Sequence, residues 1–212
     1  MYTIDTAVIK TVNEHKHLGF ILDSKLKFNL FCDELVSKAF KKWYAIKHIC
    51  SKADGKTLLR LYKAYVIPIV EFCSAVWIPN NTQSHRLERV QKRITKFIAF
   101  KMNFHNTSYN ERLNKLGLKT LVDRRKLKIL QYIQKIKTNS NSIPLDWYTR
   151  VEFTENDRIG TKIKTDFIRI SKCEKSLFFF CKQIFNDLPI HIRNELNFKC
   201  FSNFLNVFYS VK

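Results

Sequence analysis

The stretch that decides the fold reads Leu-Tyr-Lys-Ala-Tyr-Val-Ile-Pro-Ile-Val-Glu-Phe-Cys-Ser-Ala-Val-Trp, from Leu61 to Trp77. Between Val66 and Ile78 its only charged residue is Glu71, so the rest of the chain must enclose this segment on nearly all sides. These thirteen residues are too few to cross a bilayer as a helix. The segment therefore predicts a buried core helix, kinked or restarted at Pro68, with the other helices packed around it.

A helix with two different sides is predicted after the turn at Asn80-Asn81. Its apolar residues recur at the spacing of one helix face, at Leu87, Val90, Ile94 and Phe97. Cations repeat the same spacing one residue earlier, at Arg86, Arg89, Arg93 and Lys96. One side should pack into the core and the other should be cationic. Glu88 and Lys92, four residues apart, are expected to pair with each other.

Two helices are predicted upstream, and both carry cations on their outer faces. Asn29 is the expected cap of the first helix and Asp54 that of the second. The expected inward residues of the second helix are Leu58, Leu61, Tyr62 and Tyr65. The outward cations are Lys38, Lys41 and Lys42 on the first helix and Lys56, Arg60 and Lys63 on the second.

The N-terminal residues predict a β-hairpin. Apolar clusters at 2–12 and 17–22 indicate two short strands, and Asn13-Glu14 offers a turn. A lone hairpin is marginally stable in water and leaves strand edges unpaired. The residues alone allow a small ribbon that caps a helical domain.

Two shorter signals mark helices further along the chain. Ser108-x-x-Glu111 is a capping-box pattern, and Gly117 is placed to end the helix that it begins. Thr120-x-x-Asp123 opens another helix, to about Lys137, whose expected core residues are Leu127, Leu130, Ile133 and Ile136. From residue 86 to residue 137 there are fifteen Lys or Arg and three acids, so these helices are expected to share a continuous basic surface.

The tail is aromatic rather than basic. Between Arg150 and Lys212 eleven basic residues face seven acidic ones, so contact with nucleic acid should fade there. Its aromatic residues, including Phe178, Phe185, Phe198, Phe201, Phe204 and Phe208, recur at helical spacing, which favours core packing over base stacking. The polar segment Thr138–Ser142 is the expected boundary. The predicted fold is mainly α, with a β-hairpin over 1–28, a basic helical domain over 29–137 and a loop with an aromatic-rich helical region over 138–212.

Composition restricts the partner and the compartment. Of the 212 residues, 38 are Lys or Arg and 18 are Asp or Glu, giving a net charge of +20 that favours a polyanion such as nucleic acid. No signal peptide, amphipathic tail or lipidation motif is visible, so no membrane partner is expected. The six cysteines form no Cys-x-x-Cys motif, which predicts reduced thiols in an intracellular compartment, with nucleus and cytoplasm both open.

These motifs, in this order, resemble the region downstream of the polymerase palm in reverse transcriptases of non-LTR, LINE-type (jockey-like) retrotransposons. The resemblance covers nearly the whole chain, from about Lys16 to Leu205. It is carried by His17-Leu18-Gly19, Leu26-Lys27-Phe28, the Leu61–Phe72 motif with Trp77, Leu87-Glu88-Arg89-Val90-Gln91-Lys92-Arg93, Tyr109, Glu111-Arg112-Leu113, Leu116-Gly117-Leu118, Leu121, Arg124-Arg125, Phe185-Asn186 and Leu188-Pro189. It implies that the hairpin completes the palm sheet and that the helices form a thumb.

The chemistry of a polymerase active site is not expected in this chain. Two-metal nucleotidyl transfer needs converging carboxylates, which the resembled enzymes take partly from an Asp-Asp turn. This sequence has no Asp-Asp, and its four glycines are single, so no phosphate-cradling loop is predicted. We expect no catalytic residue, no metal site and no small-molecule substrate here. Mg²⁺ is expected only in a palm outside this chain, in a longer polypeptide.

The function implied by the resemblance is to hold the backbone of an RNA, DNA or RNA/DNA template–primer. The expected binding residues are Lys38, Lys41, Lys42, Lys56, Arg60, Lys63, Arg86, Arg89, Arg93, Lys96, Arg124 and Arg125. Arg124 and Arg125 could equally brace Glu111 or Asp123. Two alternatives stay open: an inactive or repurposed remnant that acts as an interaction module, and an accessory RNA-binding protein.

Overall fold

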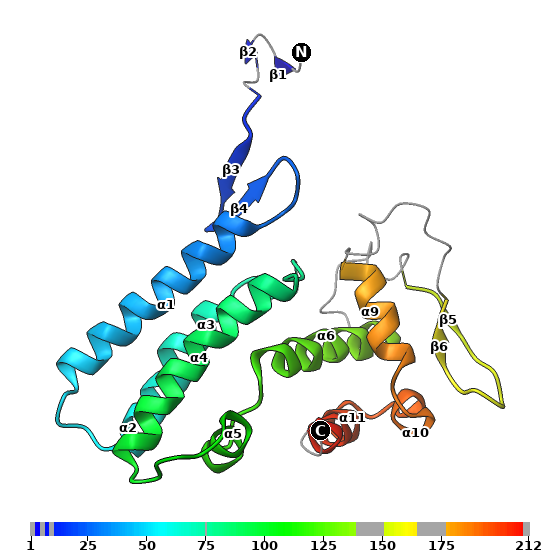
Figure 1. Cartoon of the computed structure of the whole chain (residues 1–212). Helices are drawn as coiled ribbons and strands as arrows, with labels where there is room; N and C mark the ends of the chain where they lie inside the picture. The colour runs from blue at the N-terminus through cyan, green and yellow to red at the C-terminus, as the bar shows by residue number, and fades with distance from the viewer. Residues whose placement is uncertain are drawn as a thin grey trace.

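The computed structural model describes residues 3–4, 7–8, 11–74, 76–138, 151–164 and 177–209, and its mainly helical architecture confirms the predicted fold class (Figure 1). The helices are α1 (Asn29–Ile49), α2 (Gly55–Leu61), the π-helix η1 (Tyr62–Val66), α3 (Ile67–Val70), α4 (Asn81–Lys101), α5 (Tyr109–Leu116), α6 (Leu121–Lys137), α9 (Leu177–Asn186), α10 (Ile190–Asn194) and α11 (Phe198–Phe208). The described strands form antiparallel pairs: β1 (Thr3–Ile4) with β2 (Ala7–Val8), β3 (Glu14–His17) with β4 (Phe20–Asp23), and β5 (Phe153–Thr154) with β6 (Lys162–Ile163).

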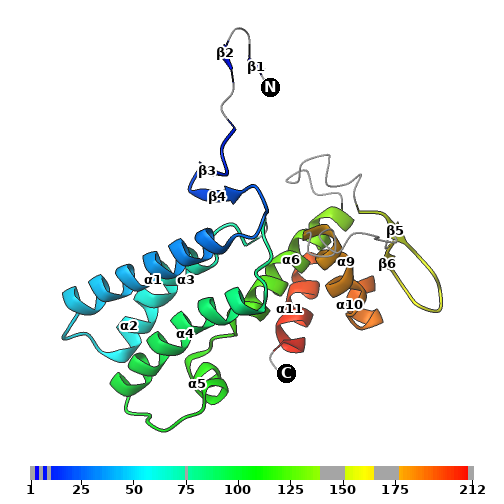
Figure 2. The ribbon, with the colours of Figure 1, turned by 45° about the horizontal axis from the view of Figure 1, so that its top comes forward.

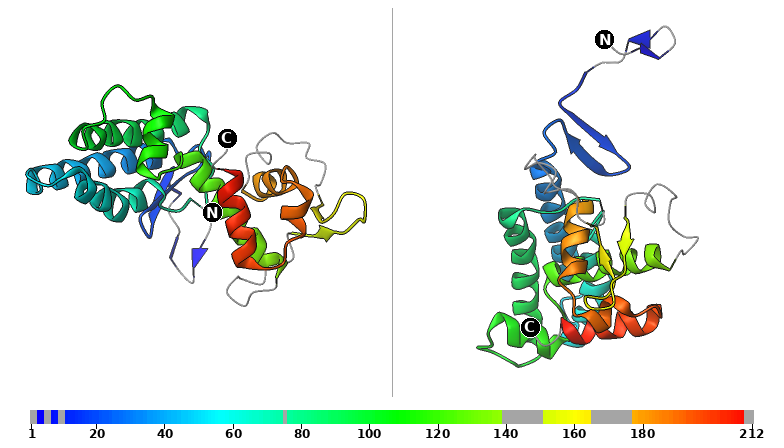
Figure 3. Two further views of the ribbon diagram at one scale, coloured as in Figure 1. Left: turned by 90° about the horizontal axis from the view of Figure 1, so that it is seen from below. Right: turned by 90° about the vertical axis from the view of Figure 1, so that its right-hand side faces the viewer.

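The hairpin β3–β4 confirms the predicted N-terminal ribbon, but its turn lies elsewhere. His17 pairs with Phe20, so the turn is Leu18-Gly19, where Gly19 has a φ of +84°. The prediction of a turn at Asn13-Glu14 is wrong because the turn requires a left-handed residue, which glycine provides at little cost. The N-terminal strands extend beyond the helices (Figure 3).

Asp23 organises the entry into α1. Its carboxylate accepts hydrogen bonds from three backbone N–H groups before the helix, including that of Phe28 at 2.7 Å. Phe28 precedes the helix in the left-handed conformation, and Asn29 is already helical, so the prediction that Asn29 caps α1 is wrong. The side-chain oxygen of Asn29 accepts instead from Gln83 Nε2 of α4, at 2.8 Å, because that amide lies beside the start of α1.

The segment around Pro68 is enclosed only in part, and it is not one helix. Val66 and Val70 are buried as predicted, but Phe72 and Val76 are 41% and 60% exposed. The π-helix η1 precedes α3, and Pro68, which has no N–H to donate, lies in the first turn of α3. α3 ends at Val70, and the next residues form turns. Trp77 is buried after these turns, so the predicted core helix is replaced by a short helix and a partly buried loop.

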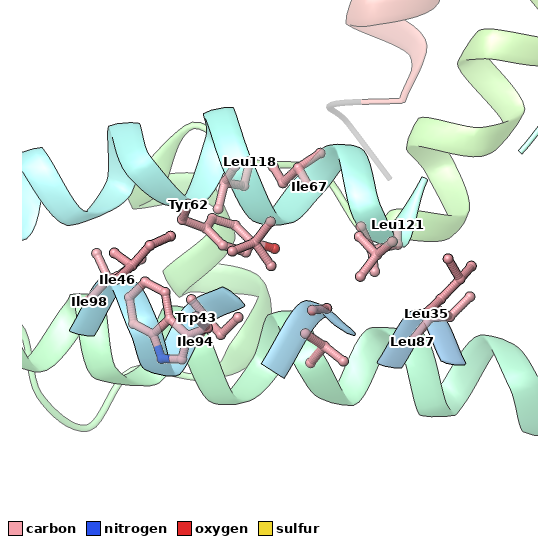
Figure 4. Close-up of a cluster of buried hydrophobic side chains, with 14 of the residues drawn as sticks. Leu35, Trp43, Ile46, Tyr62, Ile67, Leu87, Ile94, Ile98, Leu118 and Leu121 are labelled. Atoms are coloured by element: carbon pink, nitrogen blue, oxygen red, sulfur yellow. The ribbon is translucent and has the colours of Figure 1, made fainter. Parts of the chain in front are cut away.

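Three helical rods form the first part of the molecule: α1, α4 and the α2–η1–α3 segment (Figure 2). Figure 4 shows the core between them, with Trp43, Tyr62, Leu87 and Ile94 among its side chains. Tyr65 was predicted to face this core but is 54% exposed. The reason is the π-turn, which widens the helix so that Val66 rather than Tyr65 continues the buried face.

The predicted ends of α2, α5 and α6 are confirmed. Asp54 and Thr120 each accept a hydrogen bond from the N–H three residues later. Ser108 and Glu111 form a reciprocal capping box at the start of α5. Gly117 ends α5 with a φ of +59°, a conformation that favours glycine.

Helix α6 belongs to two hydrophobic clusters. Leu121 packs in the first cluster, and the four predicted core residues from Leu127 to Ile136 are buried in the second. The second cluster adds side chains of α9, α10, α11 and the β5–β6 hairpin. The division between the clusters therefore falls within α6, and the boundary near residue 138 stays a prediction because residues 139–150 lie outside the described ones.

The aromatic tail packs as predicted at Phe185 and Phe201, which are fully buried. Phe198 and Phe204 are 38% and 42% exposed, because α11 presents these faces to solvent. The side chain of Phe178 and the residue Cys173 lie outside the described part. Among the described cysteines, the free thiols are Cys32, Cys50, Cys73, Cys181 and Cys200. Within the described ranges, no helix is long and apolar enough to cross a membrane.

Candidate nucleic-acid interface

The exposed cations of α4 include Arg89, Arg93 and Lys96, which the sequence predicted as phosphate contacts. They are exposed because the opposite face buries the apolar residues from Leu87 to Ile98 in the first cluster. None of the three forms a salt bridge with a described residue. Their positive charge is therefore available to a partner.

Helices α1 and α4 pack side by side and run in the same direction. Three contacts in chain order join them: Arg86 Nη1 to Asp33 Oδ1 at 2.7 Å, the Arg93 guanidinium over Phe40 at 5.7 Å, and Lys47 Nζ over Phe97 at 4.6 Å. A further contact, from Lys101 Nζ to Ser51 O at 3.5 Å, follows just after the end of α1. The exposed faces of α1 and α4 therefore lie next to each other along the helices. We call this side, with Lys41, Arg89, Arg93 and Lys96, the α1–α4 surface.

Among the predicted cations of α1, Lys41 and Lys42 are exposed, whereas Lys38 is paired. Lys38 Nζ lies 2.8 Å from Glu34 Oε1, and Lys16 Nζ of β3 lies 2.7 Å from the same oxygen. The hydrogen bonds from Lys16 and then Lys38 lower the pKa of Glu34. One carboxylate is shared by two ammonium groups, so the group of three retains one positive charge.

The second predicted set follows the outer face of α2 and η1. Lys56 and Arg60 are exposed, and Lys63 Nζ donates to Leu116 O at 3.5 Å. The α2–η1–α3 segment packs against α1 and α4, so its outer face points away from both of them. These residues are therefore exposed as predicted, but they lie on a different side from the α1–α4 surface.

Arg124 does not point freely into solvent. Its Nε and Nη2 both donate to the buried carboxylate of Glu71, and Lys128 Nζ lies 2.7 Å from Glu71 Oε2. Burial alone would raise the pKa of Glu71, but the hydrogen bonds from Arg124 and Lys128 outweigh it and lower that pKa. The buried charge of Glu71 is therefore compensated by two cations of α6. Sequence reasoning missed Lys128, although its spacing of four from Arg124 places both on one helix face.

Arg125 is a core residue, so its prediction as a phosphate contact is wrong. It is 6% exposed, its Nη2 donates to Val70 O at 2.9 Å, and its guanidinium lies 4.9 Å from the ring centroid of Trp77. Burial lowers its pKa to about 10. Arg112 of α5 is buried too, so the basic residues of α4, α5 and α6 do not form the continuous surface expected from their number.

Glu88 also departs from its prediction. It is buried, accepts hydrogen bonds from the Tyr109 hydroxyl, from Leu121 N at 3.0 Å and from Gln91 Nε2 at 3.3 Å, and does not pair with Lys92. Burial raises its pKa. Lys92 instead places Nζ over the Tyr109 ring, at 5.1 Å. The network joins α4 to α5 and α6 under the α1–α4 surface.

Comparison with known proteins gives one similarity at the level of sequence. An uncharacterized protein of Caenorhabditis elegans is 26% identical over 133 residues, which cover 62% of this chain and 67% of that protein. No family model matches this chain. No solved structure matches it either. The similarity brings no activity, substrate or partner to this chain.

Proposed function

We propose that this chain is the non-catalytic palm-exit, thumb and downstream portion of a LINE-type reverse transcriptase, and that its α1–α4 surface binds the backbone of template–primer nucleic acid. One observation carries the binding role. Arg89, Arg93 and Lys96 are exposed on one helix and lack a carboxylate partner among the described residues. A row of unpaired cations on a protein of net charge +20 is suited to a strand of phosphates.

The contacts between motif residues support the family proposal. Residues that carry the resemblance and lie far apart in sequence meet in the fold: Glu71 with Arg124, Trp77 with Arg125, and Glu88 and Gln91 with Tyr109. These contacts join helices and loops of the fold; they do not form a catalytic site. They explain why this combination of residues would recur in a helical unit that holds, but does not extend, a primer.

The test is the salt dependence of binding. We expect the triple variant Arg89→Gln, Arg93→Gln and Lys96→Gln to bind every sequence more weakly, because phosphate contacts are independent of sequence. Three lost contacts should reduce the slope of log K against log salt by about 2 to 3, on a duplex or a single strand. Binding is measured by fluorescence anisotropy over a salt series, and circular dichroism verifies the helical content.

A matched control removes the same charge elsewhere. Arg158, Lys162 and Lys199 lie in the C-terminal part, away from the α1–α4 surface, and their change to Gln should leave the slope near that of the wild type. Equal slopes for the wild type and the α4 variant would contradict the proposal. The α1–α4 surface would then be merely solvated, as expected of an interaction module.

A further inference from the structure

A pocket of about 610 Å³ lies between the loop after α3, the second half of α6 and the first residue of α11. Its volume is within the range of about 300–1,000 Å³ that accommodates small organic ligands. The α1–α4 surface does not contribute to it. None of the residues proposed to contact the nucleic-acid backbone on α4 lines it.

Three aromatic side chains line this pocket, each from a different segment. Phe72, Tyr132 and Phe198 are 41%, 42% and 38% exposed, so part of each ring is accessible to a ligand. Lys135 lies between two of them, with Nζ 6.0 Å from the Tyr132 ring centroid and 5.9 Å from that of Phe198. The pocket thus combines flat apolar faces with a cation.

The charge at the pocket favours an anionic ligand. Among the described residues that line it, the carboxylate is Glu71, which is already bonded to Arg124 and Lys128. Lys135 makes no salt bridge with a described residue. A ligand with both an aromatic face and a negative charge complements this arrangement, and a nucleotide has both.

We propose that this pocket binds one unpaired nucleotide of a single strand, with the base against Tyr132 and Phe198 and the phosphate at Lys135. The inference rests on the proposed nucleic-acid binding and deepens it. A paired base is stacked within its duplex and cannot enter, so the pocket selects single-stranded nucleic acid. Every base has a π-face, so the site tolerates any sequence.

Binding of a labelled oligothymidylate and of a hairpin duplex to the full chain tests this assignment. Tyr132→Ala or Phe198→Ala should weaken single-strand binding by about 5- to 100-fold, the loss of one stacked base, and leave duplex binding unchanged. Lys135→Gln, which removes no ring, should weaken it less. Tyr65→Ala removes an exposed ring outside the pocket, and Lys126→Gln a half-buried lysine of the same helix, so both should bind as the wild type does.

A thiol footprint gives a second readout that needs no variant. Cys73 lines the pocket, whereas Cys50 lies at the end of α1. Bound single strand should slow the reaction of Cys73 with maleimide and leave Cys50 unchanged, and duplex should protect neither.

The outcomes separate the two proposals. If the wild type binds neither single strand nor duplex, both fail. If the α4 triple variant flattens the salt slope but the ring variants bind single strand normally and Cys73 stays unprotected, only the pocket assignment is overturned.

Discussion

Glu71 is a buried carboxylate that holds two cations of α6 against the first hydrophobic cluster. Its pKa is lowered in the folded state, so its ionised form stabilises the fold above the ordinary value of about 4.3. That stabilisation is lost as the pH falls through the lower folded value. Arg124 and Lys128 are 31% and 42% exposed, which limits the energy involved.

We expect Glu71→Gln to reduce the free energy of unfolding at neutral pH by about 1–3 kcal/mol, because both cations lose their carboxylate. Urea unfolding over a pH series measures the difference from the wild type. The difference should shrink at acid pH, where Glu71 of the wild type is protonated too. A difference that is constant with pH would show that Glu71 contributes only packing.

Glu88 should show the opposite dependence. Its pKa is raised by burial, so the folded state binds a proton more tightly than the unfolded state, and stability falls as the pH rises from about 4.3 through the folded value. Glu88→Gln removes this titration. The unfolding free energy of the variant, relative to the wild type, should therefore increase with pH in that window.

The same urea series, with Lys92→Gln as the control, measures this dependence. A relative stability that decreases with pH would mean that Glu88 is held as an anion, as a pair with Lys92 would require.

The role of a single residue could be predicted from the sequence only where nearby residues in the chain determine that role. That Glu71 needs a partner follows from its neighbours in the sequence, because a lone charge in an apolar segment must be compensated. The burial of Arg125 could not be expected, because it depends on Trp77 and Val70, which lie about fifty residues earlier. A charge count treats Arg89 and Arg125 alike, although one is exposed and the other lies in the core.

Helices α2 and α4 approach each other closely where α2 begins. A Cβ on Gly55 would lie 2.1 Å from Met102 Cγ and 3.2 Å from Ile98 O, so the two helices approach at a distance that only glycine allows. Alanine in a helix is otherwise favoured over glycine by about 1 kcal/mol. The tight contact should reverse that preference.

We expect Gly55→Ala to destabilise the fold by about 1–3 kcal/mol, and the loss to shrink in a Met102→Ala background, where space is freed. Denaturant unfolding of the two single variants and the double variant measures the coupling. A stabilising Gly55→Ala would contradict the close contact between α2 and α4.

Helix ends were predictable when the signal was local. Asp54, Ser108 and Gly117 act through hydrogen bonds or dihedral angles within a few residues, and all three predictions are confirmed. Asn29 has the same capping chemistry, but Asp23 and a left-handed Phe28 fix the entry into α1 before it. The π-turn at η1 also escaped prediction, because an α-helical spacing was assumed there.

At the scale of the whole molecule, the chain has two hydrophobic clusters whose outer surfaces differ in charge. The α1–α4 surface lies on the first cluster, and the aromatic tail fills the second. The mainly helical class and the basic outer faces followed from the sequence. The exposed pocket residues did not, because Tyr132 and Phe198 are 66 residues apart and their proximity depends on how α11 returns to α6.

Helix α6 gives this two-part architecture a mechanical property. It is one continuous helix of 17 residues, roughly 25 Å long, whose start belongs to the first cluster and whose remaining turns belong to the second. Each turn is hydrogen-bonded to the next, and Glu71 fixes two of its side chains near the start. The helix therefore connects the two clusters as one rigid element. If nucleic acid binds α4 as proposed, a shift of α4 against α6 would move α6 as a unit together with α11, which packs on it.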